Sequence, residues 1–181
     1  MPADFVHLNV HTAYTLLSGA SSVESILLTA KELGFDALAI TDRNGLYGAV
    51  SFMEKAQEVG IRPILGAELH SAEGSLIALI RDAEGYVNLC RLITARHLDK
   101  AFSLAEAVAQ WQEGLILLSP EGPLLRELSG RIAAERLFRE VRLDLPARAA
   151  LLRRSAFALS AIPPVVTNNV HFARPEGYEI H

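Results

Sequence analysis

The chain has 181 residues, half of them hydrophobic, and a formal net charge of −4 at pH 7. This length suffices for one well-buried core, and the acidic balance excludes a broad basic surface for nucleic acid. A single cysteine, Cys90, excludes an intrachain disulfide. No apolar run has the roughly 20 residues of a membrane span and no signal peptide is visible, so we expect a cytoplasmic protein.

The first half of the chain alternates between strand-like and helical segments. Residues 5–10 are typical of a short strand, and Ser21 with Glu24 forms a capping box that predicts a helix ending before Gly34. The continuous apolar run 37–41 predicts a strand covered on both faces. The further elements expected here are a helix over 50–59, a strand over 61–69, a polar turn over 71–74 and a strand over 76–80.

The second half continues this alternation, with a second capping box at Ser103 and Glu106. Strands that alternate with helices favour an α/β fold with a mainly parallel sheet. The expected helical segments are 86–96, 103–114, 123–128, 132–138 and 147–159, and the expected strands are 115–118, 141–143 and 164–167.

Polar residues follow the C-terminal ends of at least four expected strands. These ends converge in a barrel, which makes a barrel the better fit. An open doubly wound sheet would normally carry a Gly-rich phosphate loop after its first strand. Here the first strand is followed by His11-Thr-Ala-Tyr-Thr. The pattern therefore favours a β/α barrel.

Three polar residues in the first expected strand, His7, Asn9 and His11, share one face because they are two positions apart. A His-x-His pair can bring two imidazoles to one metal, but Asn9 offers only a neutral amide, which is a poorer ligand. Asp42 and Glu68 each end a buried strand, where an acid is costly unless it is paired or bound to a cation.

Asn169 and His171 repeat the spaced polar pair after the last expected strand. Each motif alone is unspecific, because a single histidine in a strand is usually a core residue. Four such clusters at successive strand ends indicate the remains of a polynuclear metal site.

Ordered motifs run through nearly the whole chain. They are Phe5-Val-His-Leu-Asn-Val-His-Thr-Ala-Tyr-Thr-Leu-Leu-Ser-Gly-Ala, Ala39-Ile-Thr-Asp-Arg-Asn-Gly-Leu-Tyr-Gly-Ala-Val, Ile61-Arg-Pro-Ile-Leu-Gly-Ala-Glu and Val166-Thr-Asn-Asn-Val-His-Phe. Together they resemble the N-terminal PHP (polymerase and histidinol phosphatase) domain of bacterial DNA polymerase III alpha subunits. The second motif is similar to the error-prone branch of these polymerases.

This resemblance implies a distorted seven-stranded β/α (TIM-like) barrel over residues 1–171. Residues 172–181 would begin a helix that leads into polymerase domains further along the chain. In active members of the family, nine side chains hold up to three Zn, Mn or Fe ions and hydrolyse phosphoester bonds.

Matching the family pattern residue by residue leaves few good ligands in this chain. Arg43 stays protonated and cannot coordinate a metal, so beside Asp42 and Glu68 it is expected to supply the positive charge of a lost ion. Asp42 and His7 are expected to lie behind the ligand positions. The positions that keep a ligand are His11, Glu68 and His171, and the degenerate ones are Asn9, Ser18, Arg43, Ser75, Pro120 and Asn169.

We therefore expect the PHP domain of a DNA polymerase III alpha-type polymerase, with a dismantled metal site and a structural or partner-binding role. The expected partners are downstream polymerase domains of the same protein and proofreading or clamp components, with DNA contacted mainly through other domains. The parent protein would be a DNA-directed DNA polymerase, and no cofactor is expected in this domain.

Two alternative functions remain open. The first is a metal-dependent phosphoesterase or 3′–5′ exonuclease with Zn, Mn or Fe at His11, Glu68 and His171. The second is a nucleic-acid-binding module, against which the acidic net charge counts.

Overall fold

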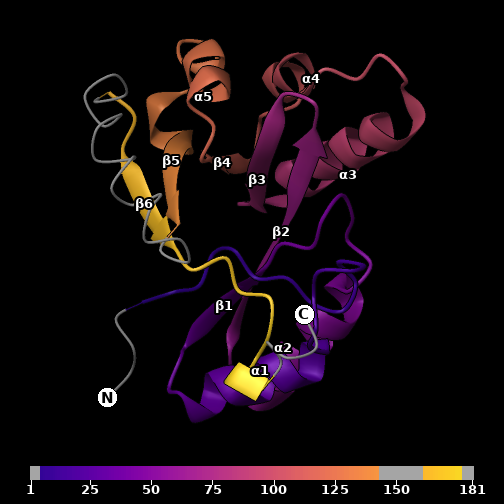
Figure 1. Ribbon diagram of the computed structural model, residues 1–181, viewed down its shortest axis with the longest axis vertical. Coiled ribbons are helices and arrows are strands. Elements are labelled where there is room, and N and C mark those ends of the chain that lie inside the picture. Colours follow the sequence, from indigo (N-terminus) through magenta and orange to yellow (C-terminus); the bar gives the residue numbers. More distant parts are fainter. Residues whose placement is uncertain (1–4, 143–160, 177–181) are drawn as a thin grey trace. The chain divides into compact units, whose positions relative to one another are not determined.

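The computed structural model describes residues 5–142 and 161–176 (Figure 1). These residues form a mixed α/β structure with six strands, five α-helices and one short 3-10 helix. The contacts divide the chain into two compact units: unit 1 comprises Met1–Ala67 and Asn169–His181, and unit 2 comprises Glu68–Asn168. Strand β2 (Arg62–Ser71) supplies residues to both units.

Unit 1 packs two helices around a short parallel strand pair. Strand β1 (Ala37–Ile40) pairs in parallel with β2, and all four of its residues are buried, which confirms the expected covered strand. Helix α1 (Val23–Glu32) packs against helix α2 (Ala49–Val59). Their apolar faces form a core with the neighbouring strand and loop, including Val10, Leu27, Leu38, Phe52 and Ile61.

The segment 5–10 does not form the expected regular strand. It is an extended stretch held by two isolated parallel bridges, His7 with Leu38 and Val10 with Val170. Backbone hydrogen bonds join it to both neighbours, since the Ala39 N–H donates to the His7 carbonyl and the Val170 N–H to the Asn9 carbonyl, and the Val10 N–H donates to Thr41 Oγ1 at 2.9 Å. His11 follows this stretch directly, and its N–H donates to the Val170 carbonyl.

The helix ends of unit 1 follow the expected signals with one change. Ser22, and not Ser21, is the N-cap of α1, since its side chain accepts from the Ser25 N–H. The Ser21 hydroxyl instead accepts from the N–H of Ala173, a tertiary contact that local sequence does not reveal. Gly34 and Gly60 follow α1 and α2 with φ of 81° and 70°, as expected for residues that end helices.

Unit 2 is built on a sheet with the strand order β2-β3-β4-β5-β6, to which β2 contributes its last residues. Strand β3 (Gly74–Ile80) runs antiparallel to β4 (Leu115–Ser119). Strands β4, β5 (Leu137–Arg142) and β6 (Pro164–Thr167) are mutually parallel. The sheet is thus mixed, with parallel pairings between β4, β5 and β6 and an antiparallel pairing between β3 and β4.

Three helices accompany this sheet: α3 (Ala83–Leu98), α4 (Leu104–Gln110) and α5 (Gly122–Leu128). Ser103 caps α4 by accepting from the Glu106 N–H, which confirms the second capping box. The expected helix over 132–138 is wrong. The chain there forms a 3-10 helix, η1 (Ala134–Arg136), and then β5, because pairing with β4 on one side and β6 on the other outweighs local helical preference.

Two elements expected from the sequence are not tested by the described residues. The helix over 147–159 and the strand end at Leu143 fall outside the described residues. The structure describes six strands, and a seven-stranded arrangement stays a prediction.

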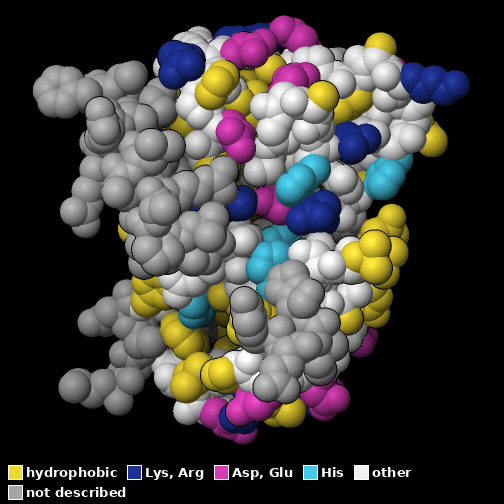
Figure 2. All heavy atoms as spheres, in the orientation of Figure 1, with side chains coloured by type: hydrophobic (Ala, Val, Ile, Leu, Met, Phe, Trp, Pro, Cys, Tyr) yellow, Lys and Arg dark blue, Asp and Glu magenta, His cyan; other side chains and the backbone are white. Residues whose placement is uncertain are grey.

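The surface charge and the helix lengths can be compared with the composition of the chain. On the face shown in Figure 2, Lys and Arg side chains are interspersed with Asp and Glu. Within the described ranges, no helix is long and apolar enough to cross a membrane.

Candidate metal centre

The buried acid in unit 1, Asp42, is held by hydroxyl and amide donors. Its carboxylate is 2% exposed and accepts from the Thr12 N–H at 2.7 Å, from Thr12 Oγ1 at 2.8 Å and from Thr15 Oγ1 at 2.7 Å. Threonine donors thus satisfy Asp42 without an ion pair to Arg43 among the described residues, and the expectation that Arg43 supplies positive charge beside Asp42 and Glu68 stays a prediction. Arg43 donates its backbone N–H to Thr15, and its Nε has no hydrogen-bond partner among the described residues.

The same threonine orients His11. Because Thr15 Oγ1 donates to Asp42, it accepts from His11 Nδ1 at 3.3 Å. This assigns a proton to Nδ1, so that Nε2 carries the lone pair whenever the imidazole is neutral. His11 is completely buried. The Asp42–Thr15–His11 chain therefore presents one imidazole in the form that a metal ligand requires.

The second retained histidine, His171, lies against His11 in a way that opposes joint ligation. The ring centroids are 4.6 Å apart and the ring planes are stacked, 15° from parallel. An imidazole binds a metal in its own ring plane, at about 2.0–2.1 Å from nitrogen. Two nearly parallel stacked planes do not meet near the rings. His11 and His171 therefore do not converge on a shared ion in this arrangement.

The remaining predicted positions of unit 1 offer weak donors. Ser18 Oγ lies 3.2 Å from His171 Nδ1. Asn9 is completely buried, and its carbonyl oxygen accepts from the Val170 N–H. Asn169 has a φ of 48°, a left-handed conformation that asparagine tolerates better than most residues. Neutral hydroxyl and amide groups are weak ligands for a transition metal.

In unit 2, Glu68 is engaged by two partners. It is 2% exposed, its Oε1 accepts from Arg142 Nη2 at 2.6 Å, and its Oε2 lies 2.6 Å from His70 Nε2. Arg142 Nε also donates to Glu140 Oε2 at 2.9 Å. Glu140 is completely buried, and its Oε1 accepts from Thr167 Oγ1 at 2.6 Å. One guanidinium thus bridges two buried carboxylates.

Two opposing effects act on the pKa of Arg142. Burial by itself lowers the pKa of this guanidinium. The nearby carboxylates of Glu140 and Glu68 outweigh burial, so the pKa of Arg142 lies above its ordinary value. Arg142 is therefore a permanent positive charge inside unit 2.

The other two predicted positions of unit 2 lie near each other but offer no strong ligand. Ser119 Oγ donates to the Ser75 carbonyl at 2.7 Å and also accepts from the N–H of Glu121. Pro120 lies between these two residues in the chain. The Ser119 hydroxyl thus links the backbone at Ser75 and Glu121.

Residues Glu140, Arg142 and Thr167 were missed by sequence reasoning. Their signal was period-two spacing, since Glu140 and Arg142 share one face of a strand, as do Glu68 and His70. The expected strand over 141–143 included Arg142 but began after Glu140, whereas β5 runs from Leu137 to Arg142. The pairing of Arg142 with Thr167 in β5 and β6 then places the three side chains together.

Neither unit, over its described residues, gathers three His, Cys, Asp or Glu side chains in a way that could hold a metal ion.

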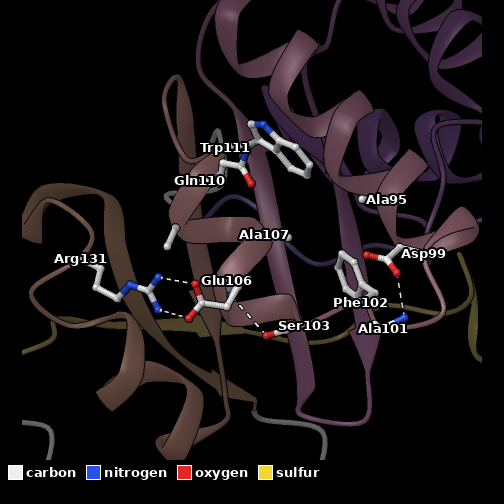
Figure 3. A pocket seen from close by; sticks show the side chains of 11 residues that line it. Ala95, Asp99, Ala101, Phe102, Ser103, Glu106, Ala107, Gln110, Trp111 and Arg131 are labelled. Atoms are coloured by element: carbon white, nitrogen blue, oxygen red, sulfur yellow. Dashed lines mark hydrogen bonds and ion pairs between the residues drawn. The ribbon is translucent and has the colours of Figure 1, made fainter.

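Unit 2 contains a pocket of about 610 Å³ between α3 and α4, lined in part by Phe102, Trp111 and the Arg131–Glu106 ion pair (Figure 3). None of the predicted site residues lines this pocket, so it is separate from the candidate centre.

Comparison with protein families identifies the class. The PHP domain family matches residues 7–152, which is most of the chain. The chain therefore belongs to the PHP domain family, as its motifs indicated.

Similar proteins are bacterial DNA polymerases. The error-prone DNA polymerase of Symbiobacterium thermophilum is 38% identical over 218 aligned positions, which cover 98% of this chain and 20% of that protein. The DNA polymerase III subunit alpha of Treponema pallidum is 34% identical over 211 positions, covering 95% and 18%. The chain spans about a fifth of the length of these relatives. Both alignments exceed the 181 residues of this chain, so each relative carries additional residues in the region.

Solved structures with the same fold are more distant in sequence. A protein of Bifidobacterium adolescentis, assigned as a metal-dependent phosphoesterase, superposes with a TM-score of 0.60 at 14% identity, covering 97% of this chain and 91% of that one. An amidohydrolase of Chromobacterium violaceum with bound sulfate gives 0.64 at 12% identity, covering 92% and 87%. These likenesses establish the fold alone.

Proposed function

We propose that this chain is the PHP domain of a bacterial DNA polymerase III alpha-type protein, replicative or error-prone, whose metal site is dismantled. Its role is then structural or partner-binding. Support comes from the named polymerase relatives, of which the chain matches one region. The parent protein would be a cytoplasmic DNA-directed DNA polymerase.

The proposal rests chiefly on the geometry of the three retained ligands. His11 and His171 stack face to face instead of converging on one point. Glu68 has its two oxygens engaged by Arg142 and His70. Residues of this chain therefore satisfy one another where the family pattern calls for ions.

The finer architecture belongs to the same proposal. We infer that residues 1–171 form one domain that closes as a distorted seven-stranded barrel, and that 172–181 begin a helix leading to polymerase domains. Those domains are the first expected partners, and proofreading or clamp components are further candidates. DNA would be contacted mainly elsewhere in the parent protein.

Metal analysis tests the proposal directly. The chain is purified without chelator, offered Zn²⁺ or Mn²⁺, desalted and examined by elemental analysis. We expect far less than one ion per chain. One tightly held ion per chain, lost in His11→Ala and in His171→Ala, would contradict the dismantled site.

The alternative function is a metal-dependent phosphoesterase or 3′–5′ exonuclease with one residual ion at His11, Glu68 and His171. One observation favours it: the Asp42–Thr15–His11 chain orients His11 with Nε2 as its lone-pair atom. Hydrolysis of bis(p-nitrophenyl) phosphate in the presence of Zn²⁺ or Mn²⁺ distinguishes the two. Turnover that disappears in Glu68→Gln would favour the enzyme.

A further inference from the structure

The side chain of Arg142 occupies the centre of a closed polar cluster in unit 2. We define this cluster as Glu68, His70, Glu140, Arg142 and Thr167. Arg142 is 13% exposed, whereas the side chains of Glu68 and Glu140 are 2% and 0% exposed. The guanidinium reaches Glu68 through Nη2 and Glu140 through Nε.

Each carboxylate oxygen of the cluster has its own partner. Glu68 Oε1 and Glu140 Oε2 accept from Arg142, while Glu68 Oε2 contacts His70 and Glu140 Oε1 accepts from Thr167. Two carboxylates removed from water require a cation and hydrogen-bond donors nearby. The cluster supplies both from within the chain.

We propose that Arg142 is a built-in cation that takes the place of a metal ion at Glu68 and keeps divalent metals from this acid. The inference rests on the proposed function and names the residue that closes this part of the site. It gives Arg142 the role at Glu68 that the sequence predicts for Arg43.

Two properties of Arg142 make the replacement permanent. A guanidinium does not lose its proton under physiological conditions, and its planar set of N–H groups can serve two carboxylates at once. The strand pairing also holds it in place, since Arg142 lies opposite Thr167 in β5 and β6. A metal ion approaching Glu68 would meet this fixed positive charge close to the carboxylate oxygen.

Arg136 provides a matched comparison in the same unit. It is similarly buried, with 10% of its side chain exposed, and it pairs with Glu113. Its carboxylate partner is 58% exposed and needs no cation in the interior. Loss of Arg136 therefore removes a contact without leaving two buried negative charges together.

The test compares thermal unfolding of the wild-type chain, Arg142→Met, Arg142→Met with Glu68→Gln, and Arg136→Met. Each is measured with EDTA and with excess Mn²⁺ or Zn²⁺. We expect Arg142→Met to lower the Tm by roughly 10 °C in EDTA, because a buried charge pair has lost one partner. Added metal should restore most of that loss, since a divalent ion can then take the position of the guanidinium beside Glu68 and Glu140.

The other variants locate the effect. Arg142→Met with Glu68→Gln should be more stable in EDTA than Arg142→Met alone, because one of the two negative charges is gone, and metal should not raise its Tm. Metal should change the Tm of neither the wild-type chain nor Arg136→Met. This pattern supports the proposal.

Two results would overturn it. The first is metal binding by the wild-type chain, measured by calorimetry, that Glu68→Gln abolishes. The second is a folded Arg142→Met whose Tm is indifferent to metal. Should Arg142→Met not fold in EDTA, recovery of its circular dichroism on adding Mn²⁺ becomes the readout, and failure to recover counts against the proposal. An ion lost only in His171→Ala would contradict the proposed function but leave the inference on Arg142 intact.

Discussion

The imidazoles of His11 and His171 stack in unit 1, with their centroids 4.6 Å apart and their planes 15° from parallel. Backbone contacts bring them together, because the His11 N–H donates to the Val170 carbonyl at 2.8 Å. The two histidines thus pack against each other as neighbours on adjoining segments.

Arg43→His should not restore tight metal binding. The new imidazole would join a site where His11 and His171 are stacked and Asp42 is engaged by Thr12 and Thr15. Titration of the Arg43→His variant with Zn²⁺ by calorimetry should show no saturable binding near one ion per chain. Tight binding that His11→Ala then removes would show that the other degenerate positions matter less than we infer.

Asp42→Asn should destabilise the chain by about 2–3 kcal/mol. The asparagine would turn an NH₂ group toward donors that now meet a carboxylate, leaving buried N–H or O–H groups without an acceptor. The free energy of unfolding in urea measures the loss. The matched control is Asp36→Asn on the exposed segment before β1, which should change stability by no more than about 0.5 kcal/mol.

Stability should fall in mild acid because of His7. Burial lowers the pKa of His7 below its ordinary value of 6.5, and its ring lies 5.0 Å from Phe5 and 4.9 Å from Phe35. The unfolded chain therefore takes up a proton first as the pH falls. The contribution of His7 is fully present above pH 6.5 and is lost as the pH falls through the lowered folded pKa.

Urea unfolding of the wild-type chain and of His7→Phe from pH 7.5 to 5.0 measures this effect. The variant keeps an aromatic ring at this position but cannot titrate, so its stability should decline less over this range. Equal pH dependence in the wild-type chain and His7→Phe would contradict the assignment.

Glu73→Ala should destabilise unit 2 by about 1 kcal/mol. The carboxylate of Glu73, in the turn between β2 and β3, accepts from the N–H groups of Leu104 and Ala105 at 2.9 and 3.0 Å, at the start of α4. High salt should reduce the effect, because part of it is electrostatic. Thermal unfolding at low and high ionic strength measures it, and Glu54→Ala on the exposed face of α2 is the control.

Much of the fold was accessible from the sequence, because the signals concerned are local. Gly34 and Gly60 end helices through their own backbone conformation, and Ser103 caps α4 through an N–H three residues away. The covered strand β1 follows from a run of apolar residues. Errors arose where distant segments decided the outcome, as for residues 132–138, which pair into a sheet, and for Ser21, whose hydroxyl contacts Ala173.

The sequence by itself determined the family and the ordered motifs, since both follow from the identity and order of the residues. It also showed that Asn9, Ser18 and Arg43 are weak or unsuitable metal ligands, since residue type alone decides whether a side chain can coordinate a metal. Only the tertiary structure decided which groups satisfy the buried acids. Asp42 is held by threonines and Glu68 by Arg142, a residue 74 positions away. The physical reason is that a buried charge is stabilised by whichever donors the fold brings to it, and those donors come from segments that are distant in the sequence.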